Sequence, residues 1–419
     1  MPDGDGLEKD FREGLAKKKA THYVQNPEEN MNQTRNPLLL YAIFLGVGYL
    51  WVAASYRSQM HLLEAFYPVE TLDRIALYGN YLAQVAGIGA FAAWLWKAPA
   101  TAGRRTVPAV SLTAAALAIA VTHLAGNAEV IVVGTIVTNF LVGVISAYYF
   151  SYLAGRIPSR HHGKAFALPF AASYVGAYLL ALADLLTWKP VFILYLVLIA
   201  VNLLLLPRLG DIPAPAAQTA SRPAASARRE IARLILVFAL TAIFLGVAQN
   251  LEYYAHIDAD VTNSLHAPLY VVGLVAGGLL FDANRKPVAL AAFLSPLFPL
   301  FSAAAADGNT AILYSAMALG GLFAGAFGVF RVTGFTVPAG VSPALLPLAG
   351  IGMGLNRLGD SVGFAAAGQI YGSSVAITVL PLAAAMLVLL LFMFYVWLRG
   401  AKTEQPPTDH PPAERSAQG

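Results

Sequence analysis

The side chains that could bind or move a small solute are few, and the densest group follows a long apolar run as AQNLEYYAHIDAD. Gln249 and Tyr253 are four residues apart and therefore share one face of a helix. We expect both to point into a central cavity together with Tyr49, although an aromatic belt followed by a solvated loop would give the same pattern. Asn250 belongs to the same expected binding group. Glu252 is the carboxylate of this stretch that lies close enough to the membrane to titrate as a coupling group.

A second stretch, LNRLGDSVGFAAAG, places Arg357 and Asp360 three residues apart on one helix face. A salt bridge between them would lower the cost of placing both charges in lipid. The pair could hold a substrate or a proton, but counting from the outer end at Gly372 puts Arg357 about one and a half turns from the inner boundary. The spacing therefore favours an inner gate or a structural bridge. Gly359 and Gly363 form a small-residue face suited to close packing against another helix.

These side chains must be positioned by helices that span a membrane. Of the 419 residues, 58% are hydrophobic and only 12% are charged, whereas soluble domains carry about 25% charged residues. Apolar runs of roughly 18 to 25 residues match the length needed to cross the hydrocarbon layer as a helix, and backbone groups in lipid must bond within the helix. We therefore predict an all-α membrane protein with twelve transmembrane helices. The predicted spans are 37–56, 78–96, 107–125, 130–152, 165–186, 190–207, 232–254, 265–281, 287–304, 310–331, 345–371 and 374–398.

The composition also excludes several classes of function. The chain has no cysteine, which excludes disulfides, thiol catalysis and thiolate metal sites. We expect neither an enzyme nor a cofactor, because there is no phosphate-cradling glycine loop, serine elbow or paired carboxylates with a histidine at useful spacing. The adjacent His161 and His162 project in different directions, which favours solvated histidines over a metal site. The net charge of +4 fits a membrane surface and gives no reason to expect nucleic acid as a partner.

The distribution of lysine and arginine predicts the orientation. With the amino terminus inside, the outer segments hold Arg57, Arg74 and Lys189, whereas the inner segments hold most of the others, Arg331 among them. By the positive-inside rule both termini are cytoplasmic, and we expect a multi-pass protein of the cell (inner) membrane. The expected cytoplasmic segments are a tail at 1–36, a linker rich in Pro, Ala and Ser at 208–230 and a tail at 399–419.

The linker divides the spans into an N-terminal bundle, 37–207, and a C-terminal bundle, 231–398, each with six spans. The hexapeptide AIFLGV begins at Ala42 and again at Ala242, near the start of the first span of each half. The loops after the second and fourth spans also match between the halves. Parallel repeats related by an axis along the membrane normal build one large class of transporters. We therefore predict two pseudo-symmetric six-helix bundles.

One loop carries a resemblance to a known family. GLLFDANRK, with Gly278, Asp282 and Lys286, resembles the G-x-x-x-D-x-x-x-(R/K) motif of the major facilitator superfamily, in the position expected after span eight. The resemblance extends over essentially all of the spans, and it implies that this loop holds the two bundles together on the cytoplasmic side. The alternative is that these are interfacial charges that terminate spans. The first-half copy, WKAPATAGRR, keeps Arg104 and Arg105 but lacks the glycine and the aspartate, which argues against latching by that copy.

Other stretches match or depart from the family. RIPSRHHGKA, which contains Arg160, resembles the basic loop that joins spans four and five. In span four, TNFLVG places Asn139 where many proton-exchanging members carry an intramembrane arginine, and span five lacks the glycine-rich pattern of drug/proton antiporters, which disfavours a multidrug exchanger. The family architecture places spans one and five side by side. Arg57 and Asp184, at matched depth, are therefore expected to form an ion pair, unless each snorkels separately into the outer headgroups.

Together these features predict a secondary active transporter that moves a small solute through the bilayer by alternating access, as a monomer, with a proton or another ion as a possible co-substrate. Protonation of Glu252 or Asp360 is the candidate coupling event, and Arg57 and Arg357 favour an organic anion over a cation. The alternatives are a non-transporting membrane sensor on the same fold and a polytopic lipid-modifying enzyme. The expected substrate-binding residues are Tyr49, Arg57, Asn139, Gln249, Asn250, Glu252 and Tyr253, and the expected gating residues are Arg104, Arg105, Arg160, Gly278, Asp282, Lys286, Arg357 and Asp360.

Overall fold

The structure is a computed structural model and describes residues 37–212, 223–255, 262–306, 308–370 and 375–402. The expected tail at 1–36, most of the tail at 399–419 and the centre of the expected linker lie outside these residues. Every regular element in the described part of the chain is helical. An all-α protein is therefore confirmed for the part of the chain that the structure describes.

The elements follow one another in two successive sets, before and after the linker. The first set is α3 (Pro37–Glu64), α4 (Val69–Arg74), the π-helix η1 (Ile75–Tyr81), α5 (Leu82–Lys97), α6 (Pro99–Ala102), α7 (Thr106–Leu124), α8 (Ala128–Arg156), η2 (Ser159–His161), α9 (His162–Leu182), η3 (Lys189–Val191) and α10 (Phe192–Leu209). The second set is α11 (Pro223–Tyr254), η4 (Thr262–His266), α13 (Ala267–Ala283), α14 (Arg285–Leu294), α15 (Leu297–Ala305), α16 (Thr310–Ala339), η5 (Pro343–Leu348), α17 (Ile351–Ile370) and α18 (Val375–Lys402).

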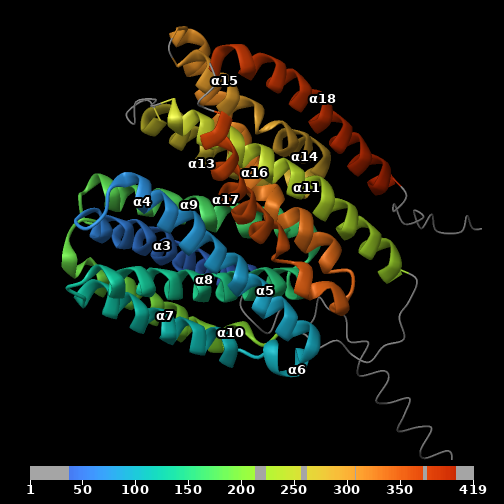
Figure 1. Cartoon of the computed structure of the whole chain (residues 1–419). Coiled ribbons are helices and arrows are strands. Elements are labelled where there is room, and N and C mark those ends of the chain that lie inside the picture. The colour runs from blue at the N-terminus through green and yellow to red at the C-terminus, as the bar shows by residue number, and fades with distance from the viewer. Residues whose placement is uncertain (1–36, 213–222, 256–261, 307, 371–374, 403–419) are drawn as a thin grey trace, which may run out of the picture.

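Ten helical segments among the described residues are long and apolar enough to cross a membrane. α17 lies outside that set, and it carries Asn356, Arg357 and Asp360. α18 contributes a shorter apolar stretch, Ala383–Arg399, to the described residues. In Figure 1 both helices run beside the other long helices. The structure thus supports a multi-pass membrane protein.

Several predicted span boundaries are wrong, because polar residues that were expected at helix ends lie inside longer helices. α4, η1 and α5 form one continuous stretch from Val69 to Lys97, so Asp73 belongs to a membrane-length helix and not to an outer loop. α16 continues to Ala339, and Arg331 therefore lies inside it. α3 likewise extends past Arg57 to Glu64. Polar groups are tolerated inside such helices where they face other protein groups or a cavity.

The two sets of helices form two packed groups, which Figure 1 shows as the blue-to-green and the yellow-to-red parts of the ribbon. One apolar core is built mainly from the first set, around Tyr41, Phe150 and Phe166. The other is built mainly from the second set, around Phe238 and Phe335. Between the groups, α5 packs against α17 and α9 packs against α13. These two seams enclose the region where the candidate site lies.

Close helix packing positions α17, which carries the predicted ion pair. A Cβ placed on Gly246 of α11 would overlap the carbonyl oxygen of Gly359, and one placed on Gly363 would overlap the backbone of Gly246. Only glycine leaves room for this approach of two backbones. The small-residue face predicted at Gly359 and Gly363 therefore packs against α11.

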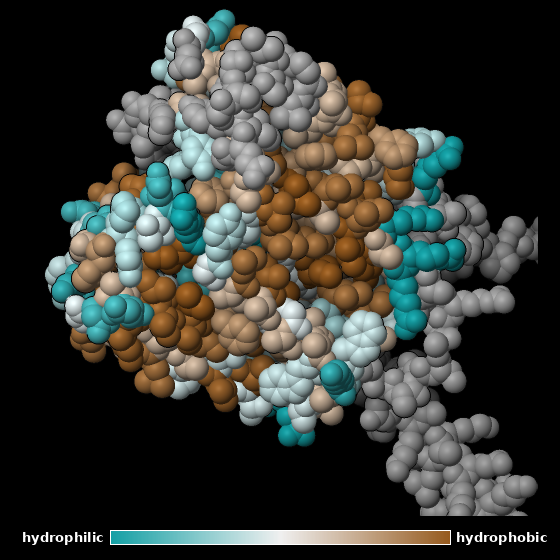
Figure 2. All heavy atoms as spheres, in the orientation of Figure 1, coloured by the Kyte–Doolittle hydropathy of each residue, from teal (hydrophilic) through white to brown (hydrophobic). Residues whose placement is uncertain are grey.

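The outer surface is what a lipid environment requires. Figure 2 shows a broad apolar face with hydrophilic residues at both edges. Leucines such as Leu117 and Leu204 are well exposed at the surface of the protein. One end of the molecule carries the turns after α5, α8 and α13, with exposed basic residues. We call it the basic end, and its exposed residues include Lys97, Arg104, Arg156, Arg160, Arg285 and Lys286. The opposite end carries the turns after α3, α7 and α9.

Candidate functional site

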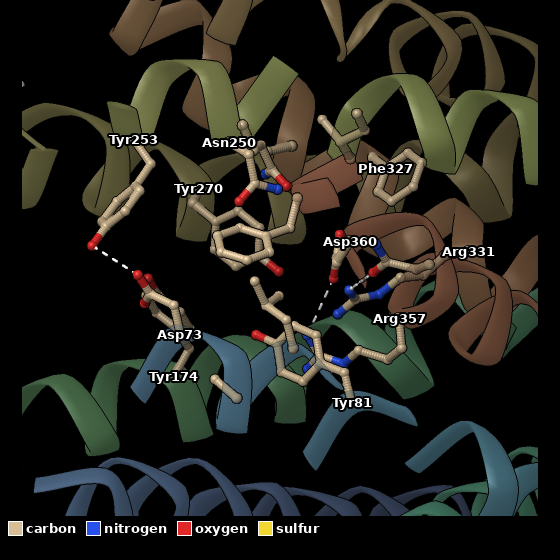
Figure 3. Close-up of a pocket in the computed structure, with 17 residues that line it drawn as sticks. Asp73, Tyr81, Tyr174, Asn250, Tyr253, Tyr270, Phe327, Arg331, Arg357 and Asp360 are labelled. Carbon is tan, nitrogen blue, oxygen red and sulfur yellow. Dashed lines mark hydrogen bonds and ion pairs between the residues drawn. The ribbon is translucent and has the colours of Figure 1, made fainter. Parts of the chain in front are cut away.

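A cavity of about 550 Å³ lies between the two groups of helices. Its walls come from α4, η1 and α9 in the first group and from α11, α13, α16 and α17 in the second. The volume is within the range of about 300–1,000 Å³ that is usual for small-molecule pockets. Figure 3 shows the arginine and aspartate side chains of α16 and α17 gathered at one side of this cavity and Tyr253 with Asp73 at the other.

Arg357 of α17 joins the two groups of helices inside the cavity. Its Nε donates to the Oε1 of Gln84 on α5 at 3.1 Å, and its guanidinium lies 4.1 Å from the centre of the Tyr81 ring. Nη1 also contacts the Oδ2 of Asp360 at 3.5 Å, so the predicted ion pair is confirmed. The sequence analysis favoured an inner gate or a structural bridge, because helix rise placed Arg357 close to the inner boundary. Helix rise does not say which residues line a cavity, and the structure places both Arg357 and Asp360 in the cavity wall.

Asn139 does not line the cavity but acts on it through Gln84. It is buried in α8, its Nδ2 donates to the carbonyl oxygen of Thr135, and its Oδ1 accepts from the Nε2 of Gln84 at 2.5 Å. The amide of Gln84 is therefore oriented with its oxygen toward Arg357. The neutral side chain of Asn139 thus holds an amide that binds an arginine from the other group of helices.

Arg331 of α16 is a cavity residue that the sequence analysis missed. Its side chain is only 9% exposed, and its Nη1 donates to the Oδ1 of Asn356 at 2.6 Å. Asn356 in turn donates from Nδ2 to the Oδ1 of Asp360 at 3.1 Å. The Nε of Arg331 is buried without a hydrogen-bond partner. The available signal was VTGFTVPAG, the weakly polar run after Arg331, which allows the helix to continue for two further turns.

A polar contact crosses the opposite side of the cavity. The hydroxyl of Tyr253 on α11 donates to the Oδ2 of Asp73 on α4 at 3.2 Å (Figure 3). Tyr253 is half exposed. Asp73 was missed because the sequence analysis placed it in the outer loop. Nearby, the ring centres of Tyr174 on α9 and Tyr270 on α13 are 5.0 Å apart, and this contact also joins the two groups of helices.

The remaining predicted binding residues divide between the cavity and its surroundings. Gln249 and Asn250 line the cavity with Tyr253, and Asn250 donates to the carbonyl oxygen of Gly246 at 2.7 Å. Tyr49 lies behind the wall, where it packs edge-on against Phe170. Glu252 also lies off the cavity, on the side of α11 that faces Ser302 of α15. Whether any of these side chains binds a solute stays a prediction.

The expected ion pair between Arg57 and Asp184 is not formed. Asp184 lies in the turn after α9, where it has a positive φ of 54° and accepts from the hydroxyl of Thr187. Arg57 is an exposed residue of α3 beside Tyr174 and is not among the residues that line the cavity. Matched depth along two helices did not fix the rotation of either side chain, and each charge faces its own local partner.

At the basic end the two groups of helices are held together by hydrogen bonds. The carboxylate of Asp282 on α13 accepts from the backbone N–H of Gly163 at 2.7 Å and of Lys164 at 3.0 Å, in the first turn of α9. Gly278 lies so close to α9 that a Cβ there would overlap the side chain of Ala167. A carboxylate at a helix N-terminus also benefits from the helix dipole. The cavity is therefore closed toward the basic end by direct contacts.

Two further contacts support this closure. The hydroxyl of Ser151 on α8 donates to the carbonyl oxygen of Leu346 at 3.0 Å. His162, buried at the start of α9, bonds through Nδ1 to the hydroxyl of Thr336 on α16 at 3.0 Å. The prediction that His162 is a solvated histidine is therefore wrong. Among the described residues, no three His, Asp or Glu side chains gather as a metal site would require.

The other predicted gating residues lie at the basic end but make different contacts. Arg105 pairs with Asp211 at 3.1 Å, which ties together two segments of the first group. Arg104 donates to the carbonyl oxygen of Ala100. Arg160 and Lys286 are exposed near the turns after α8 and α13. A gating role for these four residues stays a prediction.

Comparisons with known proteins place the fold. No protein-family model and no curated protein matches the sequence. The chain is similar in structure to the human organic anion transporter MFSD10 (TM-score 0.60, 16% identity, 87% of this chain and 100% of that one). It is also similar to FucP, the fucose:proton symporter of E. coli, in the outward conformation (0.62, 16%, 89% and 100%), and to the proton:xylose symporter XylE (0.58, 14%, 86% and 95%). At such low identity the likeness establishes the fold alone.

Proposed function

Because the chain has the fold of the major facilitator superfamily, we propose that it is a secondary active transporter that carries a small solute across the membrane by alternating access. The observation that carries this proposal is the cavity of about 550 Å³, which is lined by both groups of helices and closed at the basic end. Transporter folds of this kind bind their solute at the interface between two repeats and rock the repeats around it. A solute in this cavity would contact both groups.

We further propose twelve spans in two six-helix bundles. The first bundle would use α3, α4 to α5, α7, α8, α9 and α10, and the second α11, α13, α14 to α15, α16, α17 and α18. In this assignment the second span of each bundle packs against the fifth span of the other, as α5 on α17 and as α13 on α9. Such a reciprocal pair of seams is what two duplicated halves related by a twofold axis would produce.

The orientation proposed from the sequence says to which side of the membrane the cavity is closed. If the basic end faces the cytoplasm of the cell, as the positive-inside rule favours, the contacts of Asp282 and Ser151 close the cytoplasmic side. The likeness to FucP in the outward conformation supports the same assignment. The cavity would then load from the outer side of the inner membrane, past Tyr253 and Asp73.

Asp360 is the better candidate for coupling to a proton. It lines the cavity and accepts hydrogen bonds from both Arg357 and Asn356, so its protonation would loosen a contact that solute can also reach. Glu252 lies off the cavity and faces α15. The two symporters among the similar structures are described as proton-coupled, which supports the proposal without fixing the ion.

Flux measured in liposomes tests the proposal. Purified protein would be reconstituted and screened for counterflow, with a panel of labelled small metabolites outside and the same unlabelled compounds inside. A transporter should accumulate at least one compound above protein-free liposomes. A compound that binds the purified protein but never moves would favour the alternative, a membrane sensor on this fold.

A disulfide cross-link then tests the mechanism. The chain has no cysteine of its own, so only the introduced pair can form a disulfide. A Cβ on Gly350 would lie 3.4 Å from that of Ala147, in the other group of helices, close to the separation of about 3.5–4.5 Å in disulfides. Oxidation of the Ala147→Cys/Gly350→Cys double variant should abolish flux, and reduction should restore it. The control is Ala326→Cys/Gly277→Cys, a pair 3.8 Å apart within the second group. Equal flux before and after oxidation of the first pair would argue against alternating access.

A further inference from the structure

We propose that the solute is a small organic anion with a single carboxylate, and that this carboxylate binds the guanidinium of Arg331 at the α16 and α17 side of the cavity. The inference rests on the proposed transport function and names the chemical class of solute for the same cavity. It follows from a count of charges, a count of hydrogen bonds and the chemistry of the remaining wall. Each of these is independent of the likeness to known transporters.

The charges on this side of the cavity do not balance. Arg331, Arg357 and Asp360 all line it, so two positive charges face one negative charge. Asp360 is 3.5 Å from Arg357, and its other oxygen accepts from Asn356. Among the described residues no carboxylate lies within ion-pair distance of Arg331, because Asn356 stands between Arg331 and Asp360 as a neutral spacer. This side of the cavity therefore carries one surplus positive charge, and the other carboxylate that lines the cavity, Asp73, lies at the opposite side.

A buried charge without a counterion is expensive in a protein and more so at membrane depth. Arg331 is 91% buried, as its exposed fraction of 9% shows, and it lies well inside a helix of 30 residues. The ring of Phe170, 5.7 Å from its guanidinium carbon, offers weak cation–π stabilisation. An anionic solute would supply the missing counter-charge, and a cationic solute would add to the imbalance.

The hydrogen bonds of Arg331 point to the same class of ligand. A guanidinium has five N–H donors in a planar fork, and the described contacts use Nη1 on an amide and leave Nε buried without a partner. Arginine binds a carboxylate through two parallel hydrogen bonds with good geometry. The surplus of one charge favours a single carboxylate over a phosphate ester, which carries more negative charge. Arg57, one of the residues that had favoured an anion, lies off the cavity, and Arg331 takes its place.

The rest of the wall describes the body of the solute. Tyr81, Tyr174, Tyr270 and Phe327 present aromatic surface, and Gln249 and Asn250 present amides. In Figure 3 the rings of Tyr81 and Tyr270 lie between the arginines and the side of the cavity that holds Asp73. A flat or ring-shaped body with a hydroxyl or other polar substituent would fit this lining. A long alkyl chain would leave the amides without partners.

Thermal unfolding of the purified protein tests the class with matched pairs of probes. Benzoate, 4-hydroxybenzoate and cyclohexanecarboxylate would each be compared with the corresponding primary amide, and benzylamine would serve as the cation. A ligand that binds only the folded state raises the melting temperature. We expect at least one carboxylate to stabilise the protein while its amide and the amine do not. Stabilisation by amides or amines to the same extent would overturn the inference.

Three substitutions assign the effect to Arg331. Arg331→Gln should weaken binding of the stabilising carboxylate by about 10-fold or more, since hydrogen bonds to charged groups are the stronger ones. Arg208→Gln, an exposed arginine of α10, should not change it. Asp360→Asn should bind the carboxylate at least as tightly, because it removes a negative charge beside the two arginines. Loss of carboxylate binding in Asp360→Asn with retention in Arg331→Gln would contradict the assignment.

The remaining outcomes separate this inference from the proposed function. Stabilisation by chloride and by no carboxylate would assign Arg331 to an inorganic ion and overturn the inference. Counterflow of only neutral or cationic compounds would overturn the inference and leave the transport function intact. Binding of a carboxylate without counterflow of it would support the anion site and overturn the transport function.

Discussion

The contact between Asp282 and the start of α9 should set the balance between the conformation closed at the basic end and the open one. Its carboxylate accepts two backbone hydrogen bonds across the two groups of helices, 2.7 Å and 3.0 Å long. Asp282→Asn keeps the shape of the side chain and removes its charge. One neutral bond can remain, and the second is lost because an amide has a single acceptor oxygen.

The size of the effect follows from these two bonds. A hydrogen bond to a charged group contributes about 1.5–3 kcal/mol and a neutral one about 1 kcal/mol, and the charge at the helix N-terminus adds about 0.5 kcal/mol. Allowing for partial exposure at this end, the net loss is about 2 kcal/mol, or roughly a 30-fold change in the equilibrium. A wild-type ratio of about 99:1 in favour of the closed form would become about 3:1.

Electron–electron distance measurements on spin labels would detect this shift. The chain has no cysteine of its own, so labels can be placed at Ser159→Cys and Arg285→Cys, two exposed positions on either side of the contact. Asp282→Asn should move a substantial fraction of the distance distribution to longer values. The matched control is Asp211→Asn, which breaks the pair with Arg105 inside the first group and should leave the distribution unchanged.

An unchanged distribution in Asp282→Asn would refute the reasoning, since it would mean that the carboxylate does not bias the two conformations. A shift of the same size in Asp211→Asn would refute it as well. That result would assign the effect to a general loss of negative charge at the basic end.

Two further predictions concern the packing of α17 and the opposite side of the cavity. Gly246→Ala should lower the free energy of unfolding by more than about 2 kcal/mol, because the new methyl group meets the backbone of Gly359. The control is Gly89→Ala, where a Cβ would have nothing within 4 Å and the free energy of unfolding should change by less than about 1 kcal/mol. Thermal unfolding in detergent compares the two variants. Tyr253→Phe removes the hydroxyl that donates to Asp73. It should favour opening of the end opposite the basic end by at most about 5-fold, since an exposed contact contributes about 1 kcal/mol or less. Spin labels at Glu64→Cys and Gly308→Cys would report the opening, and closure of this end would contradict the prediction.

The sequence predicted the helices well because their cause is local. A run of apolar residues of membrane length must form a helix in lipid, whatever its neighbours are. The ends of the helices were predicted less well. Arg331 was counted as an inner charge because charges usually end a span, yet α16 continues to Ala339. Arg331 finds a hydrogen-bond partner inside the protein in the amide of Asn356 on another helix, and a single sequence does not show such a contact.

The candidate site was predicted in part for the same reason. Arg357 and Asp360 were paired correctly because both lie on one helix at a spacing that fixes their relation. Arg57 and Asp184 lie on different segments, and their ion pair depended on the rotation of each, which hydropathy does not give. Glu252 shares a helix with Gln249, but it lies on the other side of that helix from the cavity.

Arg357 links the occupancy of the cavity to the contact between the two groups of helices. It binds Asp360 on its own helix and Gln84 on α5, and Gln84 is held in turn by Asn139. An anion that enters beside Arg331 also approaches Arg357, because Arg331 contacts Asn356, Arg357 contacts Asp360, and Asn356 and Asp360 are hydrogen-bonded to each other. A ligand shifts a conformational equilibrium only if it binds the two conformations with different affinity. A solute that draws Arg357 away from Gln84 meets this condition, because it exchanges a hydrogen bond between the two groups of helices for one to itself.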